Sequence, residues 1–158
     1  MNKERTAGLI FEGEITDEQI KKIPKDFGGE IFLKGSVIGN YNTSYQIPGS
    51  VWLDGYFKAK YLKVEGDLIL ESEAMLKIKD GLDVSGNVIL KENSYIETTD
   101  INVGGDIEGV GRIDSGNINV YGTFSFKGEI ALYGNKIYAG KLDIDAVIDD
   151  CGGIKSGW

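Results

Sequence analysis

The sequence predicts an all-β fold, a single-stranded β-helix in the form of a flattened β-solenoid with about seven coils. A short phrase, in which a hydrophobic residue precedes a glycine and two more hydrophobic residues follow at alternate positions, returns along the 158 residues. Its glycines lie 17–20 residues apart. A unit of this length is too small to bury its own apolar face and must stack on its neighbours. The anchor glycines are Gly29, Gly49, Gly66, Gly86, Gly105, Gly122 and Gly140.

Residues 1–26 predict a short strand followed by a capping helix. The apolar residues of 7–13 favour the strand, and Thr16 with Gln19 three residues later matches a capping box. The helix should end before Pro24, because the residue that precedes a proline is pushed out of the α region. We expect this helix to cover the first open end of the stacked core.

Residues 27–145 predict the β-solenoid itself. Hydrophobic residues recur two positions before, two after and four after the anchor glycines, and the first of these columns runs from Phe27 to Tyr138. Residues two apart on a strand share a face, so these columns should form the core. The second half of each coil adds Phe57, Leu76 and their equivalents, which predicts two strand segments per coil. Length differences should fall in the turns. Residues 146–158 are predicted as a C-terminal tail.

Charge and composition argue against several classes of function. The net charge of −8 disfavours direct binding to nucleic acids or anionic membranes, which need a basic surface. The chain has no histidine, so imidazole catalysis and histidine metal sites are excluded. The single cysteine, Cys151, has no candidate base beside it and fits a reducing compartment. The apolar run at residues 7–11 is too short for a signal peptide or membrane span. We therefore predict a cytoplasmic, non-enzymatic protein without catalytic residues, metal or cofactor.

An outward-facing column predicts a binding surface. The residue three positions after each anchor glycine should point outward, yet the first four such residues are large and apolar. An exposed apolar stripe of a few hundred Å² usually marks a contact site. Aromatic side chains, which are enriched at interface hot spots, are also frequent between residues 41 and 61. The open alternative is that a flanking segment covers the stripe within the same molecule. The predicted binding residues are Phe32, Trp52, Ile69, Ile89, Tyr41, Tyr45 and Tyr56.

Two groups of acidic residues lead to hypotheses about function. Glu30, Asp67 and Asp106 follow their anchor glycines directly and predict an acidic face. A mimic of duplex DNA is one reading, although about 34 Å of DNA carries some 20 charges, so a solvated face is favoured. The second group lies near the C-terminus, where polysaccharide chemistry would need two carboxylates at a set separation; a solvated acidic end is favoured there. It comprises Asp143, Asp145, Asp149 and Asp150.

The repeated phrases resemble two known groups of proteins. Residues 64–70 and 84–90, each of the form Val-x-Gly-x-Leu/Val-x-Leu, resemble the coils of bactofilin-type polymer-forming proteins. Residues 23–33 are similar in part to the Leu-Pro-x-x-Leu-x-Val-Gly-Gly-x-Leu-x-Leu solenoid repeats of bacteriophage and mobile-element proteins. The resemblance implies a β-solenoid over about residues 23–145. It also implies a phage-encoded protein that binds and inhibits a host factor, such as a defence enzyme.

These observations lead to one predicted function and two alternatives. We predict a non-catalytic protein-binding β-solenoid whose partner, a host factor, contacts the aromatic-rich outward face. The first alternative is bactofilin-like self-assembly, either end to end or as a homodimer through the apolar stripe. A polysaccharide-active β-helix is the distant third.

Overall fold

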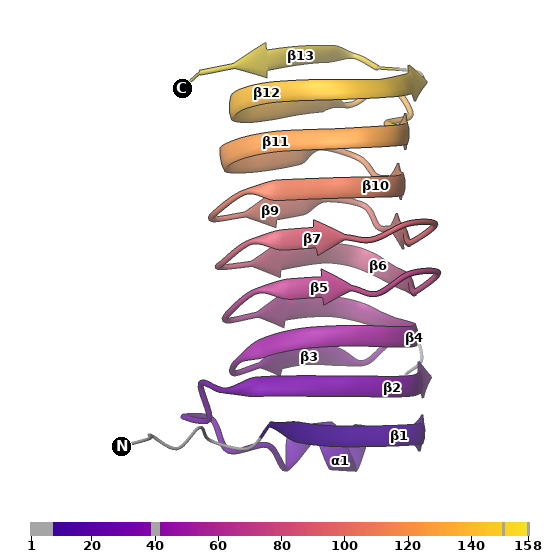
Figure 1. The fold of residues 1–158 in the computed structure, drawn as a ribbon, viewed down its shortest axis with the longest axis vertical. Coiled ribbons are helices and arrows are strands. Elements are labelled where there is room, and N and C mark those ends of the chain that lie inside the picture. Colours follow the sequence, from indigo (N-terminus) through magenta and orange to yellow (C-terminus); the bar gives the residue numbers. More distant parts are fainter. Residues whose placement is uncertain (1–7, 39–41, 150, 158) are drawn as a thin grey trace.

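The computed structural model describes residues 8–38, 42–149 and 151–157. They form a parallel β-solenoid of about eight turns, drawn in Figure 1 as a rod. The predicted all-β, single-stranded β-helix is therefore confirmed. Within the described residues, the one α-helix is five residues long, and no helix has the length and apolar character needed to span a membrane. The elements, in chain order, are β1 Leu9–Ile15, α1 Asp17–Lys21, β2 Glu30–Ile38, β3 Ser44–Ile47, β4 Ser50–Val64, β5 Leu68–Leu70, β6 Met75–Val84, β7 Val88–Leu90, β8 Tyr95–Glu97, β9 Ile101–Val103, β10 Ile107–Asp114, β11 Ile118–Ala131, β12 Lys136–Asp149 and β13 Gly153–Ser156.

The anchor glycines bring successive coils into register. Ile31 pairs with Val51, and Val51 pairs with Leu68 in the next coil. The same column continues to the C-terminal end of the rod, because each coil pairs in parallel with the coil after it. Nearly all its members are buried in one continuous hydrophobic core. Hydrophobic residues of successive coils therefore stack at the strand spacing of about 4.8 Å.

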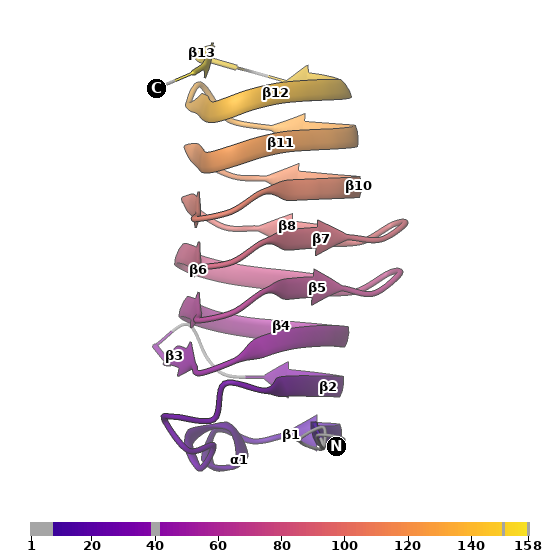
Figure 2. The ribbon, with the colours of Figure 1, turned by 60° about the vertical axis from the view of Figure 1, so that its left-hand side comes forward.

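Each complete coil has three straight segments, one more than the sequence predicts. In β4 the inward pairs are Val51 with Leu53, Phe57 with Ala59, and Leu62 with Val64. The chain bends at Gly55, and the register of β4 with β6 shifts between Ala59 and Tyr61. Long strands consequently fold around the edges of the rod (Figures 1 and 2). We name the three sides by the segments of β4 and their paired equivalents: face A holds residues 51–53, face B residues 56–59 and face C residues 61–64.

Glycine is required at the corner between faces A and B. Gly55 has φ +147°, and a Cβ atom there would lie 2.0 Å from the carbonyl oxygen of Gly35 in the preceding coil. The coils that begin at Gly66 and Gly86 replace this tight corner by loops that include Glu73 and Asn93, both at positive φ. These loops project from the rod between β5 and β6 and between β7 and β8 (Figure 2). Here the variation in coil length lies in a turn, as the sequence predicts.

Helix α1 covers part of the N-terminal end of the rod. Thr16 and Gln19 form the predicted capping box, and helix α1 ends before Pro24. Ile20 and Ile23 are buried under the first coils. Strand β1 pairs in register with β2, so it is a rung of the solenoid, and the solenoid begins before the predicted boundary at residue 27.

The C-terminal end also differs from the expected boundaries. Strand β12 continues past residue 145 to Asp149, and β13 stacks on residues 136–139. Much of the predicted tail, residues 146–158, thus continues the solenoid. The register also shifts by one residue before Lys141, so that Ala139 occupies the core position predicted for Tyr138. Tyr138 pairs with Asn119 on the outward side instead.

Candidate functional site

Face A carries an apolar stripe on its outward side. Phe32 pairs with Trp52, Trp52 with Ile69, and Ile69 with Ile89. Ile10 of β1 pairs with Phe32 and extends the stripe by one coil. Sequence reasoning missed Ile10, although Leu9-Ile10-Phe11 fits the same alternation as the later phrases. The predicted alignment of four outward residues is present, and the structure adds a fifth.

Two aromatic rings form the centre of this stripe. The rings of Phe32 and Trp52 stack with their centroids 5.7 Å apart and their planes at 26°. Both side chains are half-buried, whereas Ile10 is 58% exposed. Gly8 lies against the Phe32 ring, since a Cβ at Gly8 would come within 2.7 Å of a ring carbon. The two stacked rings therefore restrict each other's side-chain movement.

A lysine arm crosses the C-terminal half of the stripe. The Nζ of Lys91 lies 5.5 Å from the centre of the Trp52 ring and 2.7 Å from Glu71 Oε1. Lys91 follows Leu90, two coils beyond Trp52, so its side chain spans the intervening rung that carries Ile69. Ile69 is accordingly 6% exposed. The sequence does place Glu71 and Lys91 at equivalent positions of neighbouring coils. The alternation of apolar and polar residues alone, however, does not predict that Lys91 reaches Trp52.

Tyr45 and Tyr56, two of the three predicted binding tyrosines, do not join the stripe. Tyr45 is 2% exposed, packs edge-on against Phe57 at 5.3 Å and donates a hydrogen bond to Asp17. Burial, followed by the hydrogen bond to Asp17, raises the pKa of Tyr45. The prediction that Tyr45 is a binding residue is therefore wrong, because its ring completes the core. Tyr56 is half-buried on face B. Tyr41 lies outside the described residues.

The predicted acidic face is largely a hydrogen-bonded ladder. The backbone N–H of Asn87 donates to Asp67 Oδ1, and that of Thr123 donates to Asp106 Oδ1, each at 2.8 Å. The N–H of Asp67 donates to Ser50 Oγ at 2.9 Å, so the same bond recurs in the preceding coil. These side chains act like helix caps, because each accepts a backbone N–H at the corner between faces C and A. Glu30 is exposed at the start of the column.

A second polar network lies on face B and was not predicted. Arg112 binds Asp114 through Nε at 2.8 Å and Glu129 through Nη1 at 2.7 Å. The hydroxyl of Tyr95 donates to Asp114 Oδ2 at 2.8 Å. Burial, followed by this hydrogen bond, raises the pKa of Tyr95. Asp114 is 7% exposed and fully engaged, so the network supports the coils and leaves no free reactive group.

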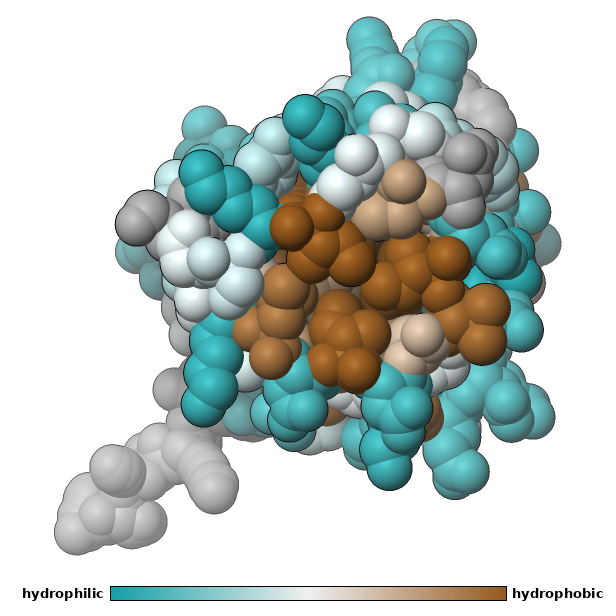
Figure 3. All heavy atoms as spheres, turned by 90° about the horizontal axis from the view of Figure 1, so that it is seen from above, coloured by the Kyte–Doolittle hydropathy of each residue, from teal (hydrophilic) through white to brown (hydrophobic). Residues whose placement is uncertain are grey.

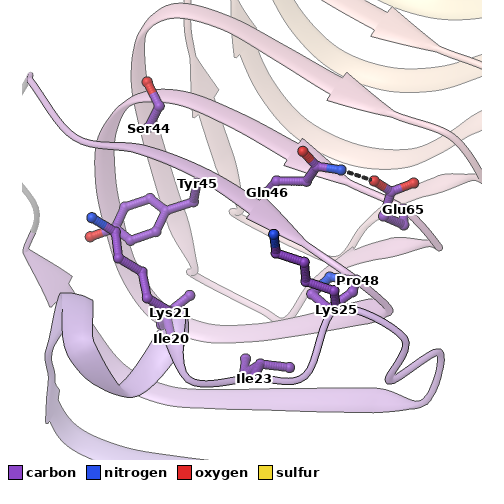
Figure 4. A pocket seen from close by; sticks show the side chains of 9 residues that line it. All are labelled: Ile20, Lys21, Ile23, Lys25, Ser44, Tyr45, Gln46, Pro48 and Glu65. Carbon is purple, nitrogen blue, oxygen red and sulfur yellow. Dashed lines mark hydrogen bonds between the residues drawn. The ribbon is translucent and has the colours of Figure 1, made fainter.

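Two hollows accompany these surfaces. A cleft of about 350 Å³ lies between the capping segment and face C, where Lys21 and Lys25 stand opposite Gln46 and Glu65 (Figure 4). The Gln46 amide donates to Glu65, so this wall is already paired. A groove of about 440 Å³ at the other end is lined by Asp143 and Asp145, among other residues. The groove is also lined by the aromatic Phe126 and the basic Lys127, so its walls are not uniformly acidic.

Little in the described residues suggests reactive chemistry. No group of three or more histidine, cysteine or acidic side chains among them is placed to hold a metal ion. Cys151 is a free, exposed thiol.

Comparisons with other proteins returned no relative. Neither a protein-family model, nor a curated protein, nor a solved structure matches this chain. The fold therefore stands on the structure itself. The resemblance to bactofilin-type proteins and to phage solenoid repeats stays a prediction.

Proposed function

We propose that this chain is a non-enzymatic binding protein that holds a partner protein on the apolar stripe of face A. The observation that carries the proposal is the in-register stack of Ile10, Phe32 and Trp52, an outward apolar row on a parallel sheet. The outward side of a solvated strand normally carries polar residues. Removing one such large side chain from water stabilises a contact by about 1.5–3 kcal/mol before ordering is counted.

The charges around the stripe define the partner that fits it. Glu30 lies at one margin, and the chain as a whole has a net charge of −8. The ladder carboxylate of Asp67 lies along the same margin, and that of Asp106 lies one coil beyond the end of the stripe. A partner surface with a flat apolar centre and a basic rim is complementary to this arrangement. The resemblance to phage repeats makes a host factor, such as a defence enzyme, the proposed partner.

Two features of the stripe suit a binding role. Phe32 and Trp52 are already stacked, so little side-chain freedom is lost when a partner covers them. Lys91 rests over Trp52 through an exposed arm, which a partner displaces easily because surface ion pairs contribute at most about 1 kcal/mol.

The test is a binding comparison between the native chain and Trp52→Asp. Partners are first recovered from host lysate with the immobilised native protein, and the strongest is purified for affinity measurement. Trp52→Asp should weaken binding about 30-fold or more, as expected for a hot-spot residue worth 2 kcal/mol or more. Ile38→Asp is the matched control, since Ile38 is a 64% exposed outward residue that follows the face A–B corner.

The control should bind like the native chain, and circular dichroism should show both variants folded. Equal affinity of Trp52→Asp and the native chain for every recovered partner would remove the stripe as a binding site. The alternative, bactofilin-like growth into filaments, needs two open ends. Helix α1 covers part of one of them, with Ile20 and Ile23 buried, while the outer edge of β1 has no strand neighbour among the described residues.

A further inference from the structure

Strand β3 has one paired edge and one open edge. On one side, residues 44–47 pair in parallel with residues 61–64 of β4. On the other side, β3 has no strand neighbour among the described residues. The outermost strands β1 and β13 also have open edges, and the view along the rod from the β13 end shows hydrophobic residues at its centre (Figure 3). The open edge of β3 differs from these, because another part of the same chain faces it across a cleft.

The backbone of Ser44 and Gln46 directs its hydrogen-bonding groups toward this open side. Successive residues of a strand in a parallel sheet point their N–H and C=O groups to opposite sides. Ile47 bonds to β4, since the N–H of Glu65 donates to its carbonyl oxygen at 2.9 Å. Ser44 and Gln46 therefore face the other way, and within the described residues no backbone group bonds to theirs on that side. A second strand is the partner that satisfies such a row of groups best.

The capping segment (residues 16–29) faces the open edge across the cleft of about 350 Å³. Two contacts fix its position relative to β3. At one end the Tyr45 hydroxyl donates to Asp17, and at the other the N–H of Gly28 donates to the carbonyl oxygen of Pro48 at 2.9 Å. Between these contacts the cleft separates the two parts of the chain, and its volume lies in the range of small ligand sites.

The walls of the cleft define the ligand that fits. Ile20 and Ile23 supply apolar surface, and the side chains of Lys21 and Lys25 rise from the capping segment toward β3 (Figure 4). Both lysines are exposed, and neither forms a salt bridge with a described residue. Glu65 is the acidic member of the lining, and it already accepts a hydrogen bond from a side-chain amide. Two positive charges beside an apolar surface favour an acidic ligand.

We propose that the cleft binds an extended acidic peptide, which adds as a strand to the open edge of β3. Alternate residues of the bound strand point to opposite faces. Its apolar side chains cover the isoleucines of the capping segment, and its carboxylates lie beside Lys21 and Lys25. The paired segment is about three residues long, because that is the length of open edge from Ser44 to Gln46. This site is separate from the stripe of face A, so the two bind independently.

The first experiment measures the affinity of the full chain for a fluorescent peptide of alternating valine and glutamate with both ends blocked. Fluorescence anisotropy is followed in about 0.15 M salt, which screens charges that are not in contact. The native chain should bind with a Kd below about 1 mM, a weak affinity typical of a short ordered segment. A peptide with glutamine in place of glutamate should bind at least about tenfold more weakly. Methylation of the peptide's backbone nitrogens should weaken binding as much, because it removes the donors for strand pairing.

Charge variants locate the peptide. Lys21→Glu and Lys25→Glu should each raise the Kd at least about tenfold, since each brings a negative charge into the cleft. Lys22→Glu is the matched control, because Lys22 is exposed beside Lys21 but does not line the cleft. It changes the net charge by the same amount and should bind within about twofold of the native chain. All three lysines are exposed, so circular dichroism should show all three variants folded.

A proline tests the open edge. Ser44→Pro removes one N–H that faces the cleft and leaves the bonds to β4 in place, because those come from Tyr45 and Ile47. It should raise the Kd at least about tenfold. Ser44→Ala keeps the N–H and should bind like the native chain. Trp52→Asp should also bind the peptide normally, so failure of the stripe and failure of this site are distinguishable.

Three outcomes would overturn the proposal. The first is a native chain that does not bind the glutamate peptide, or binds the glutamine peptide equally well. The second is a Lys22→Glu variant that loses as much affinity as Lys21→Glu, because the attraction would then need no cleft. The third is a folded Ser44→Pro variant that binds like the native chain. The methylated peptide makes the same test of strand pairing without a variant, and its equal binding would overturn the proposal even if Ser44→Pro fails to fold.

Discussion

The hydroxyl of Tyr45 donates a hydrogen bond to the Asp17 carboxylate, which ties strand β3 to the first turn of the capping helix. Asp17 also lies at the positive end of the helix dipole, so one carboxylate serves both the cap and the core. The ring of Tyr45 packs on Phe57. This contact joins segments 28 residues apart and explains why the helix stays on the end of the rod.

Tyr45→Phe isolates the hydroxyl from the ring. It should lower the free energy of unfolding by about 1.5–3 kcal/mol, the usual contribution of a hydrogen bond to a charged group. Urea denaturation followed by circular dichroism measures the change. Tyr56→Phe, at a half-buried tyrosine on face B, should change stability by no more than about 0.5 kcal/mol. Equal losses in the two variants would show that the Asp17 contact contributes nothing.

Stability should fall in alkaline solution because the buried tyrosines hold their protons. Burial, followed by the hydrogen bond to Asp83, raises the pKa of Tyr61 from 10.0 to about 12. The folded state holds this proton more tightly than the unfolded chain does, so the stabilisation is complete below pH 10 and is lost between pH 10 and about 12. Urea denaturation at a series of pH values measures the loss. Tyr61→Phe should show a shallower decline over that range, and an unchanged slope would contradict the assignment.

The corner glycines should tolerate no side chain. Gly55→Ala should destabilise the protein by about 2–4 kcal/mol, through backbone strain at positive φ and a clash with the Gly35 carbonyl. Gly81→Ala is the matched control, because the Cβ added at residue 81 would lie 3.7 Å from the nearest neighbouring atom, an ordinary contact distance. The control should stay within about 0.5 kcal/mol of the native chain. Thermal melts of the two variants decide between strain at the corner and a general intolerance of alanine.

We expect the side chains of the corner ladder to stabilise the fold through their hydrogen bonds and not through their negative charge. Asp67→Ala removes the acceptor for the N–H of Asn87 and should cost about 1–2 kcal/mol, as the loss of a helix cap does. Asp67→Asn, which keeps the acceptor oxygen, should recover most of that stability. Glu30→Ala should have little effect, since Glu30 is exposed at the end of the column. Chemical denaturation of the three variants measures this, and equal behaviour of Asp67→Ala and Glu30→Ala would reject the ladder.

Much of the fold was accessible from the period of the glycines. Once Gly66 and Gly86 were aligned, Leu68 and Val88 had to share a column, because parallel strands that repeat at a fixed interval stack like residues on like. The capping box at Thr16 is equally local, since its partner lies three residues away. The third side of each coil was not accessible, because the corner at an anchor glycine such as Gly66, between β4 and β5, does not interrupt the alternation of apolar residues.

The candidate site was accessible only in part. The alignment of Phe32 with Trp52 followed from the period. The burial of Tyr45 did not, because it depends on Asp17, which the chain brings close only after the cap has folded. Likewise, the Lys91 arm reaches across two coils to Trp52, a contact set by side-chain length and not by spacing.

By itself, then, the sequence determined the coil, its core columns and the helix over the N-terminal end. These features depend on backbone periodicity and on contacts between residues a few positions apart, and both follow from spacing along the sequence. The tertiary structure alone decided which outward residues are exposed and which carboxylates are engaged. Those properties depend on how side chains from separate coils fill the space between them, and that space exists only once the coils have stacked.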